Sequence, residues 1–227
     1  MTLRGQMIEI EGNGGFRLGA YHVEAEGARK AGLVLIQEIF GVTQHIKEQA
    51  DRFAVVGYEV IAPSLYDRQH PGFQADYDEA GIKRALELRE GHTLEDSIGD
   101  VDACRALLAP RGNVFIAGYC FGGSVTWIAA ARLEGFAAGS AYYGRLIPDH
   151  LNEVPTCPVI CHFGEHDTGI PMDLVHKVQE VTQAHGHLET FVYPAGHGFQ
   201  SDRRSDYHEE SDKLAWSRTM DLFDAQL

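Results

Sequence analysis

Short apolar runs alternate with segments of helical spacing along most of this chain. Ala31–Gln37 (AGLVLIQ) is almost continuously apolar, which is typical of a strand buried on both faces of a parallel sheet. Gln44–Val56 follows with apolar residues at helical spacing. Further strands are predicted at Tyr58–Ala62, Val114–Ala117, Phe136–Tyr142, Pro158–Phe163 and Leu188–Tyr193, and further helices at Tyr77–Arg89, Leu94–Leu108, Gly122–Arg132, Met172–His185 and Asp206–Asp224. This alternation predicts a mostly parallel sheet with helices on both faces.

The N-terminal part has a different pattern. Gln6–Ile10 and Phe16–Val23 read as strands joined by a glycine-rich turn, Gly12–Gly15, which predicts an antiparallel hairpin at one edge of the sheet. The rest of the chain has no internal repeat, low-complexity stretch or Pro/Gly/Ser linker. We therefore predict a single α/β domain over residues 1–227.

Composition narrows the choice of partners. The 227 residues are 44% hydrophobic and 23% charged, which is ordinary for a globular protein, and the net charge of −14 argues against a nucleic-acid partner. An anionic substrate would need a local cationic site.

No apolar stretch approaches the length of a membrane span, and the start does not resemble a signal segment. Four irregularly spaced cysteines fit a reducing compartment, so a cytoplasmic protein is expected.

The hexapeptide Gly118–Gly123 (GYCFGG) directly follows the apolar run Val114–Ala117. It has the form of a nucleophile elbow, G-x-S-x-G, with Cys120 in place of the serine. The glycines allow the close approach that a sharp strand-to-helix turn requires, and the helix dipole behind Cys120 favours a thiolate and an oxyanion. A structural cysteine in a glycine-rich turn is the alternative interpretation.

An acid and a base are predicted in the loops after the later strands, because such loops gather beyond the carboxyl ends of parallel strands. Asp167 follows the strand Pro158–Phe163, and His197 follows Leu188–Tyr193. The chain order of nucleophile, acid and base is that of α/β-hydrolases. Separately, Asp167 could be a helix cap and His197 a turn residue; together they predict a triad.

An oxyanion hole is predicted from two backbone N–H groups. One belongs to Phe121 and the other to Ile39, in the loop Gln37–Gly41. This assignment places Glu38 beside the sulfur, where a carboxylate would favour a neutral thiol at rest. A solvated residue at a helix N-terminus is the alternative for Glu38.

These motifs resemble the dienelactone hydrolase family of α/β-hydrolases, whose members act on carboxymethylenebutenolide. The matching pieces span most of the chain in the family's order. They are Gln37–Val42 (QEIFGV), Ala62–Tyr66 (APSLY), Gly118–Gly123, Tyr142–Gly144, Asp167 and Ala195–Phe199 (AGHGF).

The resemblance implies the α/β-hydrolase fold and a Cys120–His197–Asp167 triad. It also implies that Glu38 holds the thiol neutral until substrate displaces the carboxylate, which then accepts the thiol proton. Attack on the lactone carbonyl would expel an enolate, and water would release a dienoic acid. No metal or organic cofactor is implied.

The chain departs from the family's pattern where two arginines bind the substrate carboxylate. The first position falls at Lys83 or Arg84, and the second falls at Ser201, with Arg203 and Arg204 slightly beyond. The substrate-binding residues that we predict are Lys83, Arg84, Phe40, Tyr142, Tyr143, Phe199 and Arg203.

No metal site is predicted, because His162, His166 and His176 have a spacing that matches no common ligand pattern. The prediction is a monomeric or small homo-oligomeric carboxylic-ester hydrolase, without nucleic-acid or membrane partners. It opens an enol lactone through a Cys120 thiol ester, in the degradation of aromatic compounds. The alternatives are a broader thiol-dependent carboxylesterase and a non-catalytic binding protein that keeps the hydrolase fold.

Overall fold

A computed structural model describes residues 3–227 of the chain. They fall into two compact units, one ending at Phe115 and one running from Ile116 to Leu227. Eight strands and six α-helices lie within the described residues. Among these residues, no helix combines the length and the apolar character needed to cross a bilayer. The single domain expected over 1–227 stays a prediction.

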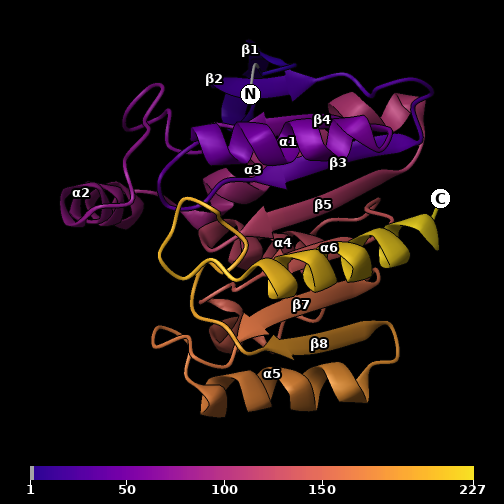
Figure 1. The fold of residues 1–227 in the computed structure, drawn as a ribbon. Helices are drawn as coiled ribbons and strands as arrows, with labels where there is room; N and C mark the ends of the chain where they lie inside the picture. The colour runs from indigo at the N-terminus through magenta and orange to yellow at the C-terminus, as the bar shows by residue number, and fades with distance from the viewer. Residues whose placement is uncertain (1–2) are drawn as a thin grey trace. The chain divides into compact units, whose positions relative to one another are not determined.

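In the first unit, a predicted hairpin leads into parallel strands (Figure 1). The strand order is β1–β2–β4–β3, with β1 and β2 antiparallel to each other, β2 antiparallel to β4, and β3 parallel to β4. The elements are β1 (Gln6–Glu11), β2 (Arg17–Val23), β3 (Ala31–Ile36), α1 (Gln44–Val55), β4 (Tyr58–Pro63), α2 (Glu79–Glu90) and α3 (Leu94–Leu108), with short 3₁₀ turns at Asn13–Gly15 and Ala109–Arg111.

The buried strands of this unit have the apolar pattern that the sequence indicated. All six residues of β3 and all six of β4 are buried, as expected for strands covered on both faces. Helix α1 begins after Thr43, whose hydroxyl accepts from the Ile46 N–H at 3.5 Å, and packs on β4 with a buried stripe that includes Ile46 and Phe53.

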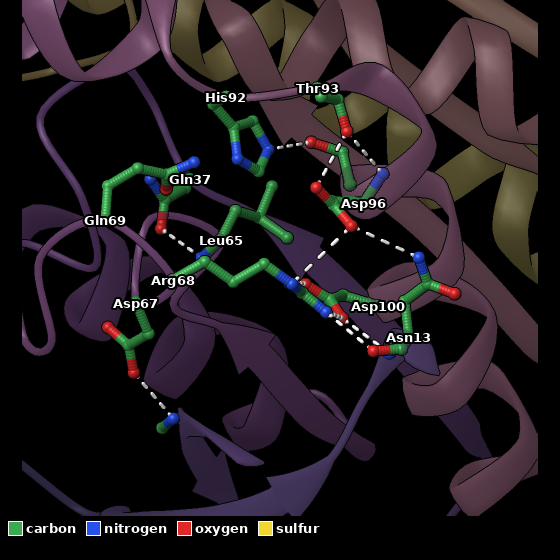
Figure 2. A network of polar contacts seen from close by, with 12 residues as sticks. Asn13, Gln37, Leu65, Asp67, Arg68, Gln69, His92, Thr93, Asp96 and Asp100 are labelled. Carbon is green, nitrogen blue, oxygen red and sulfur yellow. Dashed lines mark hydrogen bonds and ion pairs between the residues drawn. The ribbon is translucent and has the colours of Figure 1, made fainter. Parts of the chain in front are cut away.

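A polar network fastens the loop after β4 to α3 (Figure 2). The Arg68 guanidinium forms a bidentate ion pair with Asp100 and lies 3.5 Å from Asp96, and it also donates to the Asn13 carbonyl at 2.9 Å. In the same loop, Asp67 accepts from the Gly19 N–H at 2.7 Å. Helix α2, in contrast, stands away from the strands of its unit in Figure 1.

The second unit is built on four parallel strands in the order β5–β6–β7–β8. Helix α4 packs on β6, α5 on β8, and α6 on β7. The elements are β5 (Val114–Tyr119), α4 (Phe121–Arg132), β6 (Gly139–Tyr142), a 3₁₀ turn at Ile147–His150, β7 (Val159–Gly164), α5 (Met172–Ala184), β8 (Leu188–Tyr193) and α6 (Glu209–Asp224).

The predicted fold class is confirmed: an eight-stranded, mostly parallel sheet with an N-terminal antiparallel hairpin and helices packed on its strands. Most predicted bounds lie within two residues of the observed ones, and two starts differ by three residues. Strand β6 begins at Gly139 rather than Phe136, which is buried but lies outside the ladder. Helix α6 begins at Glu209 rather than Asp206, because the side chain of His208 caps it by accepting from the Ser211 N–H.

Candidate active site

The predicted elbow forms a sharp strand-to-helix turn between β5 and α4. Cys120 lies at the turn itself, with φ 56° and ψ −113°, a left-handed backbone that a residue with a Cβ adopts only at a cost. Its N–H donates to the Tyr142 carbonyl at 3.0 Å, and its carbonyl accepts from the Ser124 N–H at 3.3 Å. These bonds hold the strained turn against β6 and the first turn of α4.

Two glycines of the elbow are required by close packing. A Cβ on Gly118 would lie 2.2 Å from the Gly122 carbonyl oxygen, and a Cβ on Gly123 would lie 2.2 Å from the Tyr142 carbonyl oxygen. Both contacts are with backbone atoms, which cannot move aside as the end of a side chain can. Helix α4 therefore approaches both its own strand and β6 at distances that only glycine allows.

The structure brings Cys120, His197 and Asp167 into one hydrogen-bonded line. His197 Nε2 lies 3.3 Å from Cys120 Sγ, and His197 Nδ1 lies 2.6 Å from Asp167 Oδ2. The three residues come from the turn after β5, the loop after β8 and the loop after β7, as expected for groups at the carboxyl ends of parallel strands. This is the geometry of a nucleophile, a base and an acid that orients the base.

Asp167 is fixed by its own loop. Its Oδ1 accepts from the N–H groups of Gly169 at 2.8 Å and Ile170 at 3.1 Å, which leaves Oδ2 directed at His197. The carboxylate side chain is fully buried. Because two backbone donors fix the buried carboxylate, its free oxygen can accept the N–H of the imidazole and so determine the tautomer of His197.

The pKa of His197 reflects this arrangement. Burial alone lowers it, but the charge on Cys120 and the hydrogen bonds to Asp167 and Cys120 outweigh burial and raise the pKa from 6.5 to about 10. An imidazolium at His197 is thus stabilised through neutral pH.

The raised pKa predicts a pH effect. Because the folded pKa lies above the unfolded value of 6.5, the imidazolium stabilises the fold fully below pH 6.5 and loses this contribution as the pH rises through about 10. In an NMR titration we expect the His197 ring to have its midpoint near pH 10. Replacing Cys120 with alanine should lower that midpoint, since the charge on Cys120 is the largest cause that raises it. A Cys157→Ala variant should leave it in place. An unchanged midpoint in the Cys120→Ala protein would contradict the charge pair.

A cluster of aromatic side chains lies beside His197. The Tyr143 ring lies 5.1 Å from His197 and 5.4 Å from Phe199 (ring centroids), and Tyr143 itself has a φ of 38°. Both Tyr143 and Phe199 are fully buried, and Tyr142 is 1% exposed. The Tyr142 hydroxyl pairs with Thr219 Oγ1 at 2.8 Å, inside the unit. The substrate contacts that the sequence predicts for these three residues stay predictions.

His162, one of the histidines whose spacing matches no metal-ligand pattern, lies in a buried network of hydroxyl groups. Its Nδ1 is 2.8 Å from the Tyr193 hydroxyl, and its Nε2 is 3.2 Å from Ser140 Oγ and 3.3 Å from Thr219 Oγ1. Burial, followed by the nearby charge of Arg218, lowers its pKa to about 3. His162 is therefore a neutral, hydrogen-bonded core residue.

A cation lies next to the histidine loop. A Cβ on Gly198 would lie 2.6 Å from Arg204 Nε and 2.9 Å from its Cζ, so the guanidinium group lies against Gly198, the residue after His197. Arg203, the residue predicted for substrate binding, is exposed, whereas Arg204 is half-buried. A turn places Arg204 at this position, and in it the Arg204 N–H donates to the Ser201 carbonyl at 3.1 Å.

The predicted residues of the first unit lie in the loop after β3 and on α2. Glu38 is fully buried and its Oε2 accepts from the Tyr77 hydroxyl at 2.6 Å. Gln37 fixes this loop, because its Oε1 accepts from the Leu65 N–H at 3.1 Å (Figure 2) and its Nε2 donates to the Glu38 carbonyl at 3.3 Å. Phe40 is buried, with its ring centroid 4.6 Å from that of Tyr77.

Lys83 and Arg84 are exposed on α2, and the Arg84 guanidinium lies 5.9 Å from the centroid of the Phe73 ring. Ile39 lies in the turn between Glu38 and Gly41. Glu38 and Ile39 belong to the first unit, and Cys120 and Phe121 to the second. Their joint roles at the thiol and in the oxyanion hole stay predictions.

Comparison with known proteins identifies the family. The model of the dienelactone hydrolase family matches residues 18–227. The chain belongs to this family. A candidate carboxymethylenebutenolidase of Synechocystis sp. is 32% identical over 212 residues, which cover 86% of each chain. Carboxymethylenebutenolidase 1 of Cupriavidus pinatubonensis is 29% identical over 223 residues, which cover 95% of this chain and 94% of the relative.

A solved structure extends the match to the fold of the dienelactone hydrolase family. The crystal structure of a candidate dienelactone hydrolase from Klebsiella pneumoniae has a TM-score of 0.86, with 31% identity and coverage of 98% of each chain. Both the family that the motifs resembled and the predicted α/β-hydrolase fold are therefore confirmed.

The local sequence pattern does not indicate two contacts near these motifs. The bond from Tyr77 to Glu38 joins residues 39 positions apart, and nothing in the local pattern around Tyr77 indicates it. Arg203 and Arg204 are adjacent basic residues, and position along the chain predicts Arg203 for the substrate, although it is the exposed one of the two. The contact between Arg204 and Gly198 depends on how the loop after His197 folds back.

Proposed function

We propose that the protein hydrolyses an enol lactone or another activated ester through a covalent thiol ester on Cys120. The observation that carries the proposal is the line of contacts from Cys120 Sγ to His197 Nε2 at 3.3 Å and from His197 Nδ1 to Asp167 at 2.6 Å. Membership of the dienelactone hydrolase family and similarity to carboxymethylenebutenolidases support the substrate class.

In the first half of the reaction, the Cys120 thiolate attacks the carbonyl carbon of the lactone. The electron pair of the carbonyl moves to its oxygen, which the Phe121 N–H at the start of α4, together with the predicted Ile39 N–H, would stabilise. The intermediate collapses with cleavage of the ring C–O bond. The enol oxygen leaves with that electron pair as an enolate, which takes the proton from His197, so His197 is left neutral and the acyl group remains on sulfur.

In the second half, neutral His197 removes a proton from water, and the hydroxide attacks the thiol ester. The C–S bond breaks, the thiolate is regenerated, and His197 again holds a proton beside it. The sum is one ester bond and one water converted to a carboxylic acid and an enol. Asp167 keeps the imidazole oriented in both halves. A thiolate suits good leaving groups, so amides should be poor substrates.

The resting state involves Glu38 in this proposal. The buried carboxylate, held by Tyr77, takes the thiol proton when substrate arrives, as the family resemblance implies. A thiol kept neutral between turnovers would be protected from other electrophiles. The His197 titration also tests this step, because a thiol that stays neutral in the free protein would leave the His197 midpoint unchanged in the Cys120→Ala protein.

The substrate is proposed to carry a carboxylate that pairs with Arg204. The net charge of −14 repels anions in general, so an anionic substrate needs a local cation, and the Arg204 guanidinium lies against the residue that follows His197. A planar guanidinium can hold a carboxylate through two hydrogen bonds. Arg204 thus takes the place of Arg203 in the proposed subsite.

Turnover of a carboxylate-bearing enol lactone and of its methyl ester tests both parts of the proposal. We expect the wild type to hydrolyse the charged lactone faster. We expect Arg204→Gln to lower kcat/KM for it by about tenfold or more, because a charge-assisted hydrogen bond is lost. The methyl ester should be affected little.

The matched control is Arg203→Gln, which removes the same charge from the neighbouring exposed position and should leave the preference intact. Equal losses in the two variants would show a general charge effect and remove Arg204 from the site. If the wild type hydrolyses neither the charged lactone nor its methyl ester, an enol lactone is not the substrate class.

The main alternative is a broader thiol-dependent carboxylesterase, which would hydrolyse simple aryl esters as fast as the lactone. A non-catalytic binding protein with this fold would hydrolyse neither. The four free cysteines fit the reducing cytoplasm in which a route for aromatic degradation is expected to operate.

A further inference from the structure

A histidine and two carboxylates meet where β2 ends beside β4, in the first unit and apart from the residues discussed so far. Their ligand atoms, from His22, Glu24 and Glu59, all lie within 4.8 Å of one another. His22 Nε2 is 3.1 Å from Glu59 Oε1 and 4.0 Å from Glu24 Oε1.

The register of the strands explains the meeting. β2 runs antiparallel to β4, with His22 opposite Ile61 and Val23 opposite Val60. Side chains two residues apart on a strand point to the same face, so Glu59, two residues before Ile61, shares the face of His22. Glu24 is the first residue after β2. Two of the three ligand atoms are therefore held by paired strands, and the third belongs to the segment that leaves β2.

Two arginines orient the buried carboxylate without using the oxygen that faces His22. Arg29 Nε donates to Glu59 Oε2 at 2.6 Å, and Arg111 Nη1 donates to the same oxygen at 3.0 Å. Glu59 Oε1 is directed at His22. Such outer hydrogen bonds to a carboxylate are typical of sites in which its other oxygen binds a metal ion.

The cluster also has an accessible side. A surface pocket of about 450 Å³ is lined by residues 4–6 and 22–26, which include His22 and Glu24. Glu24 is 63% exposed and can move, whereas Glu59 is 8% exposed and is held. A small ion could enter from this pocket and keep one position open to water.

We propose that His22, Glu24 and Glu59 form a binding site for a divalent transition-metal ion, with Zn²⁺ as the best match. One imidazole nitrogen and two carboxylate oxygens suit Zn²⁺ better than Mg²⁺ or Ca²⁺, which prefer oxygen alone. Tetrahedral zinc with bonds of about 2.0–2.2 Å separates its ligand atoms by about 3.3–3.5 Å. The His22–Glu59 pair, at 3.1 Å, is already near this spacing, and the exposed Glu24, at 4.0 Å from His22, has to move closer.

The competing interpretation is a purely ionic cluster, in which the arginines neutralise the two glutamates and a proton on His22 fills the centre. Arg111 lies 3.6 Å from Glu24 and opposes a cation there, but its side chain is 53% exposed and can swing into solvent. Arg29 is 10% exposed and stays on Glu59 Oε2. The two interpretations differ in one measurable property, the response to a metal.

Isothermal titration with Zn²⁺ alone provides the test, in a Cys120→Ala background that removes the thiol as a competing ligand. We expect one binding event, weakened about tenfold or more by His22→Gln and by Glu24→Gln. Zn²⁺ should also raise the melting temperature of the Cys120→Ala protein, here called the parent, but not that of the parent carrying Glu24→Gln. Mg²⁺ should do neither.

Glu26→Gln is the matched control. Glu26 is an exposed glutamate of the same pocket, two residues from Glu24, and is paired with Arg4 rather than with the cluster. Binding should survive this change. The proposal is overturned if Zn²⁺ binds no more tightly to the parent than to Glu24→Gln, or if Glu26→Gln weakens binding equally. Glu24 is exposed, so Glu24→Gln should fold normally. Its Zn²⁺ affinity therefore tests the site even if His22→Gln impairs folding. None of these outcomes depends on ester hydrolysis.

Discussion

Replacing Cys120 with alanine is expected to lower kcat/KM for an activated aryl ester by about 1,000-fold or more. The change removes the nucleophile but leaves the His197–Asp167 pair at 2.6 Å in place. Alanine keeps a Cβ, so the backbone at φ 56° is no more strained than with cysteine. The loss should therefore appear in activity, with the cooperative unfolding transition unchanged.

The control for this prediction is Cys157→Ala. Cys157 is partly exposed, as Cys120 is, but it takes no part in the triad contacts. Its pKa is raised to about 11 by burial, so its thiol is a poor nucleophile at neutral pH. Substantial hydrolysis by Cys120→Ala would mean that another group attacks the ester. Mass spectrometry of the wild type during slow turnover should then show acylation away from Cys120.

Replacing Gly123 with alanine is expected to destabilise the protein by about 3 kcal/mol or more. Helix propensity alone predicts the opposite, because alanine is better than glycine inside a helix by about 1 kcal/mol. The new Cβ, however, would lie 2.2 Å from the Tyr142 oxygen and 2.9 Å from the Tyr142 carbonyl carbon. Overpacking against backbone outweighs propensity here, so the net effect is a large loss.

The same change should also impair catalysis, since the Tyr142 carbonyl accepts the Cys120 N–H at 3.0 Å. Urea unfolding gives the free energy, and residual activity of the folded fraction gives the second effect. Gly186→Ala is the control, because its Cβ would meet no atom within 4 Å. A Gly123→Ala protein as stable as Gly186→Ala would show that α4 can move away from β6 at little cost.

Much of the fold could be predicted because its signals are local. Six buried residues in β3 read as an apolar run, and the predicted bounds of α3, Leu94–Leu108, are those observed. Where the local pattern predicted the wrong start of an element, a contact with a more distant residue or a side-chain cap set the observed start. Phe136 is apolar and buried, but the ladder with β7 begins only at Gly139. The cap at His208 delays α6 because a histidine side chain, rather than one of the usual capping residues, accepts from the helix.

The candidate site divides in the same way. Cys120, Asp167 and His197 were identified because each follows a recognisable strand, and parallel strands bring their carboxyl ends together. The sequence could not show which of Arg203 and Arg204 lies beside the histidine loop. The two residues are adjacent and chemically identical, and only the path of the loop directs their side chains differently. Similarly, the side chains of His22 and Glu59 are 37 residues apart, and only the β2–β4 register joins them.

For this protein, the sequence by itself determined the order of the elements, the strained cysteine elbow and the family. These follow from periodicity and from the steric demands of glycine over a few residues. Only the tertiary structure decided which arginine lies beside the histidine loop, that His162 is a neutral core residue, and that a histidine and two glutamates come together at the end of β2. Those facts depend on register and on how loops fold back, which are set by packing between segments far apart in the chain.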